Sequence, residues 1–377
     1  MSDVVDLLTP EAVREAGHRM LALARAGGTG FGLHDAALPG LATRVAAVIR
    51  RRHPGLRVPF HARWRHFGGR WEALGATLAE PRERARAEFD LAILSVLLDA
   101  GAGMAWRYLA ADGEALSRSE GLGVASLEMF AAGLFSSRAT EPLRADDDRL
   151  AAVSAEELAR GFQASAENPL AGLEGRAGLL RRLGQVSGAL PGARPGGLFD
   201  LLARGGSVEA RDILRALLRH LGPIWPGRER LGDTWDHPSL GPVPFHKLSQ
   251  WLAYSLIEPL ERAGVAVTGL DALTGLAEYR NGGLFLDGGV LTLRDPADAA
   301  REHAPGDALV VEWRALTVAL LDEVAPLVRA ELGVAEGDFP LVRLLEGGTW
   351  FAGRELAAGL REDGGPPLRV RSDGTVF

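Results

Sequence analysis

The residue that stands out first is Lys247, because it is the only lysine among 42 basic residues and all the others are arginines. A coding bias towards arginine accounts for this scarcity, so a lysine that survives it marks a position where no substitute serves. A lysine ammonium is a compact charge whose pKa can shift, which a guanidinium cannot imitate. Two of the three tyrosines and one of the two asparagines share residues 247–281 with Lys247. We therefore expect chemistry in this window.

Residues 245–254 (FHKLSQWLAY) are predicted to form a helix. Lys247, Trp251 and Tyr254 share one of its faces, because they are spaced i, i+4 and i+7. A lysine on an aromatic face suits phosphate binding or an amine with a shifted pKa. The alternative is a surface lysine whose stem packs along apolar neighbours. We take Lys247 and the preceding His246 as candidate contacts to a substrate.

A second polar group follows at residues 278–281, where Glu278, Tyr279, Arg280 and Asn281 lead into two glycines. This order is typical of a turn that presents polar groups to a cleft, and we take all four as candidate site residues. The alternative is an ion pair of Glu278 with Arg280 that serves structure alone.

The loop at residues 225–244 is rich in proline and glycine and contains Asp233, Trp235 and His237. A carboxylate beside tryptophan can have a raised pKa and act as a general acid. Asp233 is therefore a candidate catalytic residue, and Trp235 is a candidate pocket wall. Aspartate is also common as a helix cap or turn former, which is the alternative for Asp233.

The segment at residues 59–67 (PFHARWRHF) mixes aromatic and basic side chains too closely for an amphipathic surface. We take Phe60, His61, Arg63 and Trp64 as candidates for a pocket wall that stacks on a planar ligand. The alternative is a loop whose aromatic side chains fill the core. A lesser candidate is the segment at residues 346–350 (EGGTW), where we expect Thr349 to cap a helix. The favoured interpretation is a simple cap, and the alternative is an anion site at the exposed N–H groups.

Most of the chain is predicted to be helical. Helix periodicity or capping residues mark residues 9–27, 39–52, 81–98, 154–162, 170–186, 207–221, 245–257 and 308–332. Hairpins are expected at residues 284–293 and 368–377, and irregular loops at 191–197 and 225–244. The fold class is therefore mainly α with small β-hairpins. We expect one compact unit over residues 1–377, the alternative being two closely packed lobes divided near residue 190.

The composition excludes several classes of function. The net charge is −7 and the basic residues are scattered, so no nucleic-acid polymer is expected as a partner. No apolar stretch approaches the roughly 20 residues of a membrane helix, no secretion signal opens the chain, and a cytoplasmic location is the default. The chain has no cysteine and lacks P-loop, HExxH and GxSxG motifs. Neither a metal nor a cofactor is therefore expected, and the oligomeric state is left open.

Five motifs together resemble those of the uracil-catabolism protein family, over essentially the whole chain. They are residues 60–64 (FHARW), 118–122 (RSEGL), 245–252 (FHKLSQWL), 276–283 (LAEYRNGG) and 372–377 (SDGTVF). The resemblance implies a role in a pathway that opens the uracil ring of a nucleotide, passes through an N-ribosylurea species and releases urea.

A more distant resemblance is to the queuosine-phosphate salvage family. It is carried by Phe245, Lys247 and Gln250 on the predicted helix and by residues 273–280 (LTGLAEYR). It implies a mostly helical, DNA-glycosylase-like fold and hydrolysis of the N-glycosidic bond of a nucleoside 5′-phosphate, with Lys247 and Glu278 in the active site. Glu278 stands where those enzymes have aspartate, and after Arg280 the sequence Asn-Gly-Gly replaces an apolar residue and proline.

Together the resemblances imply a hydrolase that splits N-ribosylurea 5′-phosphate into urea and ribose 5-phosphate without a metal ion. Glu278 would stabilise the cationic transition state or activate water. Asp233 or His237 would protonate the departing urea, and Lys247 and Arg280 would hold the phosphate.

The aromatic rings of Phe60, Trp64 and Trp235 would exclude water from such a site. Two other functions are left open. One is hydrolysis of the ureido amide in place of the glycosidic bond. The other is a non-catalytic protein that binds a uracil-derived metabolite and regulates its use.

Overall fold

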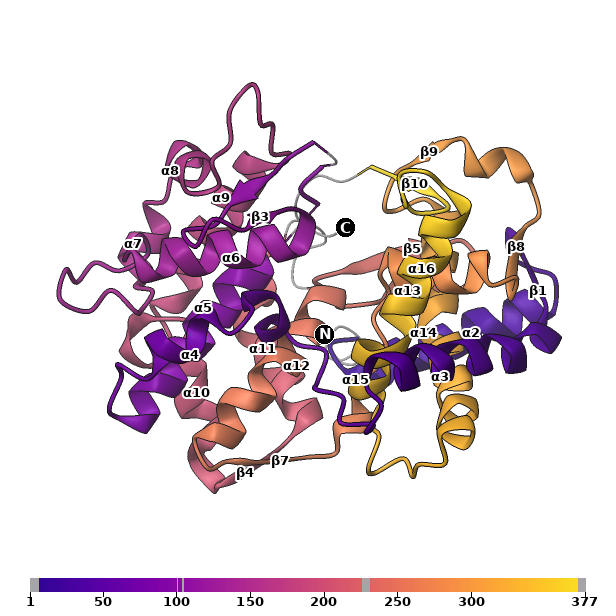
Figure 1. Cartoon of the computed structure of the whole chain (residues 1–377), viewed down its shortest axis with the longest axis horizontal. Helices are drawn as coiled ribbons and strands as arrows, with labels where there is room; N and C mark the ends of the chain where they lie inside the picture. The colour runs from indigo at the N-terminus through magenta and orange to yellow at the C-terminus, as the bar shows by residue number, and fades with distance from the viewer. Residues whose placement is uncertain (1–6, 100, 104, 226–230, 372–377) are drawn as a thin grey trace. The chain divides into compact units, whose positions relative to one another are not determined.

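The computed structural model describes residues 7–99, 101–103, 105–225 and 231–371. In this part of the chain the protein is mainly helical, and its short strands pair two by two (Figure 1). The predicted fold class, mainly α with small β elements, is confirmed. The likeness to a DNA-glycosylase bundle stays a prediction. No helix in these ranges is long and apolar enough to cross a lipid bilayer.

The described residues group into two units that are discontinuous in sequence. Unit 1 contains residues 7–61, 233–250 and 269–371, and unit 2 contains described residues between 62 and 232 together with residues 251–268. Helix α12 (Lys247–Arg262) contributes its first turn to unit 1 and its remainder to unit 2. Each unit is described separately below.

Unit 1 is built on one long buried helix, α14. The unit also contains α2 (Pro10–Arg25), β1 (Phe31–Leu33), α3 (Leu38–Arg52), β5 (Thr234–His237), β6 (Gly241–Pro244), α13 (Tyr279–Asp287), β8 (Leu291–Leu293), β9 (Glu302–His303), α15 (Leu341–Leu344), α16 (Trp350–Leu360) and β10 (Arg369–Val370). Helix α14 (Ala308–Leu332) has 25 residues, and α2, α3 and α13 pack against it (Figure 1). Its apolar sequence explains this central place, because a helix that is hydrophobic on all sides must be buried.

Unit 2 has its core around α5 (Pro81–Leu97), which is buried continuously from Ala87 to Leu97. The other regular elements of this unit are α4 (Arg70–Gly75), β2 (Tyr108–Leu109), β3 (Ala115–Leu116), α6 (Arg118–Ala131), α7 (Asp147–Ala151), α8 (Ala155–Gly161), α9 (Leu173–Ser187), α10 (Gly197–Leu202), β4 (Ser207–Glu209), α11 (Ala210–Leu221) and β7 (Ala266–Thr268). Strands β4 and β7 pair in parallel.

Several helix boundaries follow from local signals in the sequence. The Thr9 side chain accepts a hydrogen bond from the backbone of Ala12 (3.1 Å) at the start of α2. Ser154 and Glu157 form the predicted capping box of α8. Helix α14 has the predicted bounds, and Gly333 ends it in the left-handed conformation. Short-range capping therefore sets these ends.

The predicted hairpin at residues 284–293 is wrong. Residues 284–287 complete α13, and the strand that follows, β8, pairs in antiparallel fashion with β1 from the start of the chain. Glu278 caps the start of α13, and the helix then runs to Asp287, so Gly288 and Gly289 follow a helix and do not form the turn of a hairpin. The hairpin prediction overlooked this N-terminal cap. The strand partner lies more than 250 residues away in sequence, which no local pattern reveals.

Four further expectations need correction or lie partly outside the described residues. Residues 207–209 form a strand in place of the first helical turn, and residues 191–193 form a 3₁₀ turn. The loop at 225–244 contains the β5–β6 hairpin, and its residues 226–230 lie outside the described residues. For the hairpin at 368–377, residues 372–377 are likewise outside them, and β10 pairs in parallel with β9.

Thr349 does not cap a helix. It lies in a π-helical turn, Leu345–Thr349, that continues directly into α16, and its own φ and ψ are helical. The helix therefore begins before Thr349, at α15. An anion site at a free helix N-terminus is excluded at this position, because the N–H groups there lie inside a continuous helical stretch.

We expect Gly353→Ala to destabilise the protein by about 1–3 kcal/mol. A Cβ at this position would overlap the carbonyl oxygen of Arg280, where α16 packs against α13. The matched control is Gly359→Ala on the same helix, where a Cβ meets no atom within 4 Å; it should stabilise by about 0.5–1 kcal/mol. Urea unfolding followed by tryptophan fluorescence measures both, and equal effects would contradict the close packing of α13 and α16.

Candidate functional site

Asp233 is held by a buried ion pair in unit 1. It directly precedes β5, and its carboxylate takes two hydrogen bonds from Arg314 of α14, Nη1 to Oδ1 at 2.8 Å and Nη2 to Oδ2 at 2.6 Å. The indole N–H of Trp235 donates to Oδ1 (2.8 Å), and the backbone N–H of Lys247 donates to Oδ2 (3.1 Å). Four donors therefore surround one carboxylate, and Asp233 binds the first residue of α12.

The pKa of Asp233 moves opposite to the prediction. Burial alone would raise it, but the charge and hydrogen bonds of Arg314, with those of Trp235 and the Lys247 backbone, lower it to about 2. The expectation of a raised pKa is therefore wrong, since a tryptophan neighbour here donates a hydrogen bond to the carboxylate. A carboxyl group that is ionised at neutral pH has no proton to give to a leaving group.

Glu278 occupies the N-cap of α13. Its Oε2 accepts from the backbone N–H of Arg280 (2.9 Å) and its Oε1 from that of Asn281 (2.7 Å). Glu278 as a whole is half-buried. The N-terminal end of a helix favours negative charge and fixes its position. The contact between Glu278 and Arg280 runs through the backbone amide of Arg280, so the alternative of a Glu278–Arg280 ion pair is not observed.

The segment that leads to Glu278 is anchored on both sides. Arg314 Nε donates to the carbonyl of Ala277 (3.4 Å), and Gln250 Nε2 donates to Thr274 Oγ1 (2.8 Å). Arg314 therefore joins Asp233 to the residue that precedes Glu278. In this way the structure brings together two of the sequence-predicted groups, residues 233–247 and residues 278–281, within unit 1.

Arg280 is 7% exposed and lies between two aromatic rings. Its guanidinium carbon is 4.5 Å from the ring centre of Trp350 and 5.2 Å from that of Tyr279. Among the described residues no carboxylate forms an ion pair with this guanidinium. A buried charge without a counter-charge is costly, so the arrangement favours an anionic ligand. Tyr279 and Arg280 also line a small pocket with Arg354 and Arg361.

Asn281 adds an unused acceptor to the same helix start. It is 1% exposed, its Nδ2 donates to the carbonyl of Leu276 (3.3 Å), and its Oδ1 has no hydrogen-bond partner within the described structure. Buried polar atoms are nearly always paired, so an orphan deserves an explanation. An N–H or O–H group of a bound ligand would satisfy it.

His61 lies near Trp350, the same tryptophan whose ring lies next to the Arg280 guanidinium. Its ring centre is 6.4 Å from that of Trp350, and its Nδ1 lies 2.7 Å from Glu346 Oε2. Glu346 belongs to the π-helical turn before α16. Phe60 is half-buried next to His61, and the guanidinium of Arg343 lies 4.8 Å from its ring centre. Four elements of unit 1 thus supply the set Glu278, Arg280, Trp350, His61 and Glu346.

Two predicted wall residues belong to unit 2 and have partners inside it. Arg63 is fully buried, with its Nη1 3.2 Å from Asp99 Oδ2 and its Nε donating to Ser95 Oγ (2.6 Å). The indole N–H of Trp64 donates to the carbonyl of Ser255 (2.7 Å). For these two residues the alternative of a core-filling loop matches the observed burial.

The two histidines near Asp233 in sequence, His237 and His246, also have polar contacts. His246 adopts the left-handed conformation (φ +48°), its Nε2 lies 2.9 Å from the carbonyl of Leu7, and burial lowers its pKa. His237 Nε2 faces Glu312 Oε1 at 3.2 Å, and its Nδ1 accepts from the backbone of Ser239 (3.3 Å). Both nitrogens of His237 are therefore used.

Three residues that contact the predicted site residues are not among those predicted: Arg314, Glu346 and Trp350. Arg314 carried a usable signal, since an arginine within the otherwise apolar run of α14 requires a buried partner. Glu346 and Trp350 flank Thr349 in the lesser candidate segment, but the sequence did not reveal their contacts with His61 and Arg280. Across the described ranges, no three histidine, aspartate or glutamate side chains are grouped as metal ligands would be.

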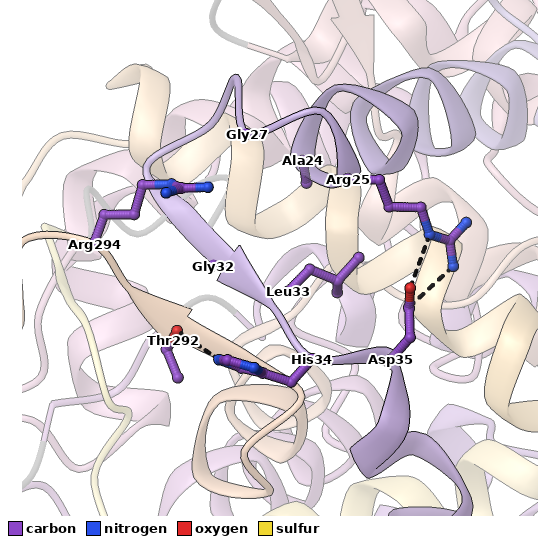
Figure 2. Close-up of a pocket in the computed structure, with 9 residues that line it drawn as sticks. All are labelled: Ala24, Arg25, Gly27, Gly32, Leu33, His34, Asp35, Thr292 and Arg294. Carbon is purple, nitrogen blue, oxygen red and sulfur yellow. Dashed lines mark hydrogen bonds and ion pairs between the residues drawn. The ribbon is translucent and has the colours of Figure 1, made fainter.

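A separate pocket of about 370 Å³ lies beside β1 and β8 (Figure 2). Arg25 borders it and is paired with Asp35 (3.0 Å) and Glu323 (2.8 Å). Figure 2 shows His34 reaching Thr292, with Nε2 and Oγ1 3.2 Å apart. The charge of Arg25 is balanced by Asp35 and Glu323, and Arg294, which also borders the pocket, donates through Nε to the carbonyl of Thr29 (2.9 Å).

Comparisons with known proteins identify the family. A family model described as "Protein of unknown function (DUF1688)" matches residues 6–377. The chain is 40% identical over 399 aligned positions to protein urg3 of Schizosaccharomyces pombe, covering 99% of both chains. It is 39% identical over 378 positions to uracil catabolism protein 4 of Lachancea kluyveri, covering 85% of each. The motif-based expectation is thereby confirmed, and the chain belongs to the DUF1688 family.

Proposed function

We propose that this protein acts in uracil catabolism as a hydrolase of an N-glycosidic bond, converting N-ribosylurea 5′-phosphate and water into urea and ribose 5-phosphate. A relative with 39% identity is named uracil catabolism protein 4, which supports the pathway. The observation that carries the reaction is the Glu278 carboxylate, held by the backbone N–H groups of Arg280 and Asn281. The Arg280 guanidinium of the same helix start is buried, and the described residues give it no carboxylate as an ion-pair partner.

The chemistry of the reaction matches these two groups. Cleavage of the bond between C1′ and the urea nitrogen leaves positive charge on the ribose ring, which a fixed carboxylate stabilises. The same carboxylate accepts a proton from the water whose oxygen adds to C1′. Arg280 and Lys247 bind the phosphate, and Asn281 Oδ1 accepts a hydrogen bond from a ribose hydroxyl or a urea N–H. The departing urea nitrogen takes up one proton, which balances the equation.

The test is incubation of chelator-treated protein with N-ribosylurea 5′-phosphate, with urea and reducing sugar followed together. Equal release of both supports the proposal. Release of ammonia or carbamate without reducing sugar would replace it by amide hydrolysis. Saturable binding of the substrate with no product would replace the proposed hydrolase by a non-catalytic binding protein. Calorimetry on the same sample distinguishes that outcome from an absence of binding.

A further inference from the structure

Trp313 of α14 carries a buried hydrogen-bond donor that the proposed mechanism leaves unused. The residue is 1% exposed, and its indole N–H has no hydrogen-bond partner within the described structure. An indole N–H can only donate, so it requires an acceptor, and buried polar atoms are nearly always paired. Trp313 is thus the counterpart of Asn281, whose Oδ1 is a buried acceptor that lacks a donor in the same part of the chain.

Both atoms lie at the start of α13. A Cβ at Gly282 would be only 2.7 Å from Trp313 Nε1, so the glycine allows the indole to approach the helix this closely. The Asn281 side chain reaches back along the chain, and its Nδ2 donates to the carbonyl of Leu276 (3.3 Å). The backbone N–H of Asn281 donates to Glu278 (2.7 Å). The unused donor, the unused acceptor and the proposed catalytic carboxylate therefore meet at the first turn of one helix.

The next residue of α14, Arg314, fixes this approach from the other side. Its Nε donates to the carbonyl of Ala277, directly before Glu278 (3.4 Å), while its Nη atoms bind Asp233. Two consecutive residues of α14 thus contact the same helix start. The buried ion pair with Asp233 therefore holds the Trp313 indole in place relative to Glu278.

We infer that Trp313 and Asn281 together recognise the ureido group of the substrate. This inference rests on the proposed glycosidic hydrolysis. A ureido group is planar and presents a carbonyl oxygen beside N–H groups. The carbonyl oxygen accepts from Trp313 Nε1, and an N–H donates to Asn281 Oδ1. One ligand group of this kind satisfies both unpaired atoms, and it assigns the Asn281 acceptor to the urea N–H and not to a ribose hydroxyl.

The contact with Trp313 also assists the departure of urea. As the bond between C1′ and nitrogen breaks, its electron pair passes to the urea nitrogen and is shared with the carbonyl oxygen. A fixed N–H donor at that oxygen stabilises the developing negative charge, as an oxyanion hole does. The urea nitrogen then takes up the proton that the attacking water loses, so the equation of the proposed reaction is unchanged.

The test measures ligand affinity by calorimetry in a Glu278→Gln background, where turnover of the substrate is expected to be slow. Trp313→Phe keeps an aromatic ring and removes the N–H. We expect it to weaken the binding of N-ribosylurea 5′-phosphate about tenfold, the size of one hydrogen bond. Ribose 5-phosphate lacks the ureido group, and its affinity should not change. In the active enzyme the same substitution should lower kcat/KM by about 10²-fold.

The matched control is Trp106→Phe in unit 2. The indole N–H of Trp106 is also buried, but it donates to the carbonyl of Phe162 (3.0 Å). Its removal should lower stability and leave both affinities unchanged. Urea unfolding of each variant shows whether it is folded, and if Trp313→Phe is not, Asn281→Leu takes its place with the same expected pattern.

Two outcomes would overturn the inference. One is an affinity for N-ribosylurea 5′-phosphate that does not depend on Trp313 or does not exceed that for ribose 5-phosphate. The other is an equal loss of affinity for both ligands, which would indicate that Trp313 and Asn281 serve structure alone. Binding that depends on Trp313, in a wild-type protein that does not cleave the bound substrate, would instead refute the proposed hydrolysis and leave the ureido site standing.

Discussion

Replacing Glu278 by glutamine is expected to lower turnover of N-ribosylurea 5′-phosphate by about a thousandfold or more, a loss of the size seen when a catalytic group is removed. Glutamine keeps the length of the side chain and one of the two acceptor oxygens that bind the N–H groups of Arg280 and Asn281. In the proposed reaction, this substitution removes the charge that would stabilise the ribosyl cation and accept the proton of water. Substrate affinity should change little, because the proposed phosphate ligand Arg280 is unchanged.

The chain offers a matched control for this substitution. Glu80 caps α5 in unit 2 in the same manner, with its carboxylate accepting from the backbone N–H groups of Arg82 and Glu83. Glu80→Gln loses the same kind of cap, at a cost of about 1 kcal/mol, and should keep full turnover. Steady-state kinetics and calorimetric binding measure both variants. Normal turnover in Glu278→Gln, or equal losses in the two variants, would refute the catalytic assignment.

Asp233→Asn is expected to destabilise the protein by about 3–5 kcal/mol, because it leaves the Arg314 guanidinium buried without its counter-charge. The damage should spread to the site, since Arg314 also holds the carbonyl of Ala277 next to Glu278. We therefore expect a lower kcat with an unshifted pH profile, which is the signature of a positioning residue and not of an acid. Urea unfolding gives the first quantity and pH-dependent kinetics the second.

The same substitution should remove part of the acid sensitivity of the fold. The pKa of Asp233 is about 2 in the folded protein, below the usual value near 3.9. The carboxylate therefore stabilises the fold above pH about 4, and this contribution is lost as the pH falls through about 2. The stability of Asp233→Asn should therefore not show this decrease as the pH falls. The control is Asp112→Asn, an exposed partner of Arg70, which should change little. Wild-type stability of Asp233→Asn would contradict the central role of the ion pair.

Part of this site was within reach of the sequence. The scarcity of lysine, asparagine and tyrosine directed attention to residues 247–281, and the structure places Glu278, Arg280 and Asn281 together at one helix start. The sequence did not show which side chain forms a hydrogen bond or ion pair with each of these residues. Asp233 shows the difference: the expectation rested on Trp235 as an apolar neighbour, whereas Arg314, 81 residues further along the chain, decides its charge.

What the sequence by itself determined is local. The ends of α2, α8 and α14 follow from capping side chains and a terminal glycine within a few residues, so short-range hydrogen bonds are enough to predict them. The mainly α class follows in the same way from helical periodicity.

Only the tertiary structure decided the pairings between distant segments. Strand β8 pairs with β1, the guanidinium of Arg280 lies against Trp350, and His61 meets Glu346. Each of these depends on which faces of α13, α14 and α16 are buried together, and the free energy of that burial is shared by the whole core of unit 1. The chemistry of a side chain is readable in the sequence, but its charge state and its partner depend on packing.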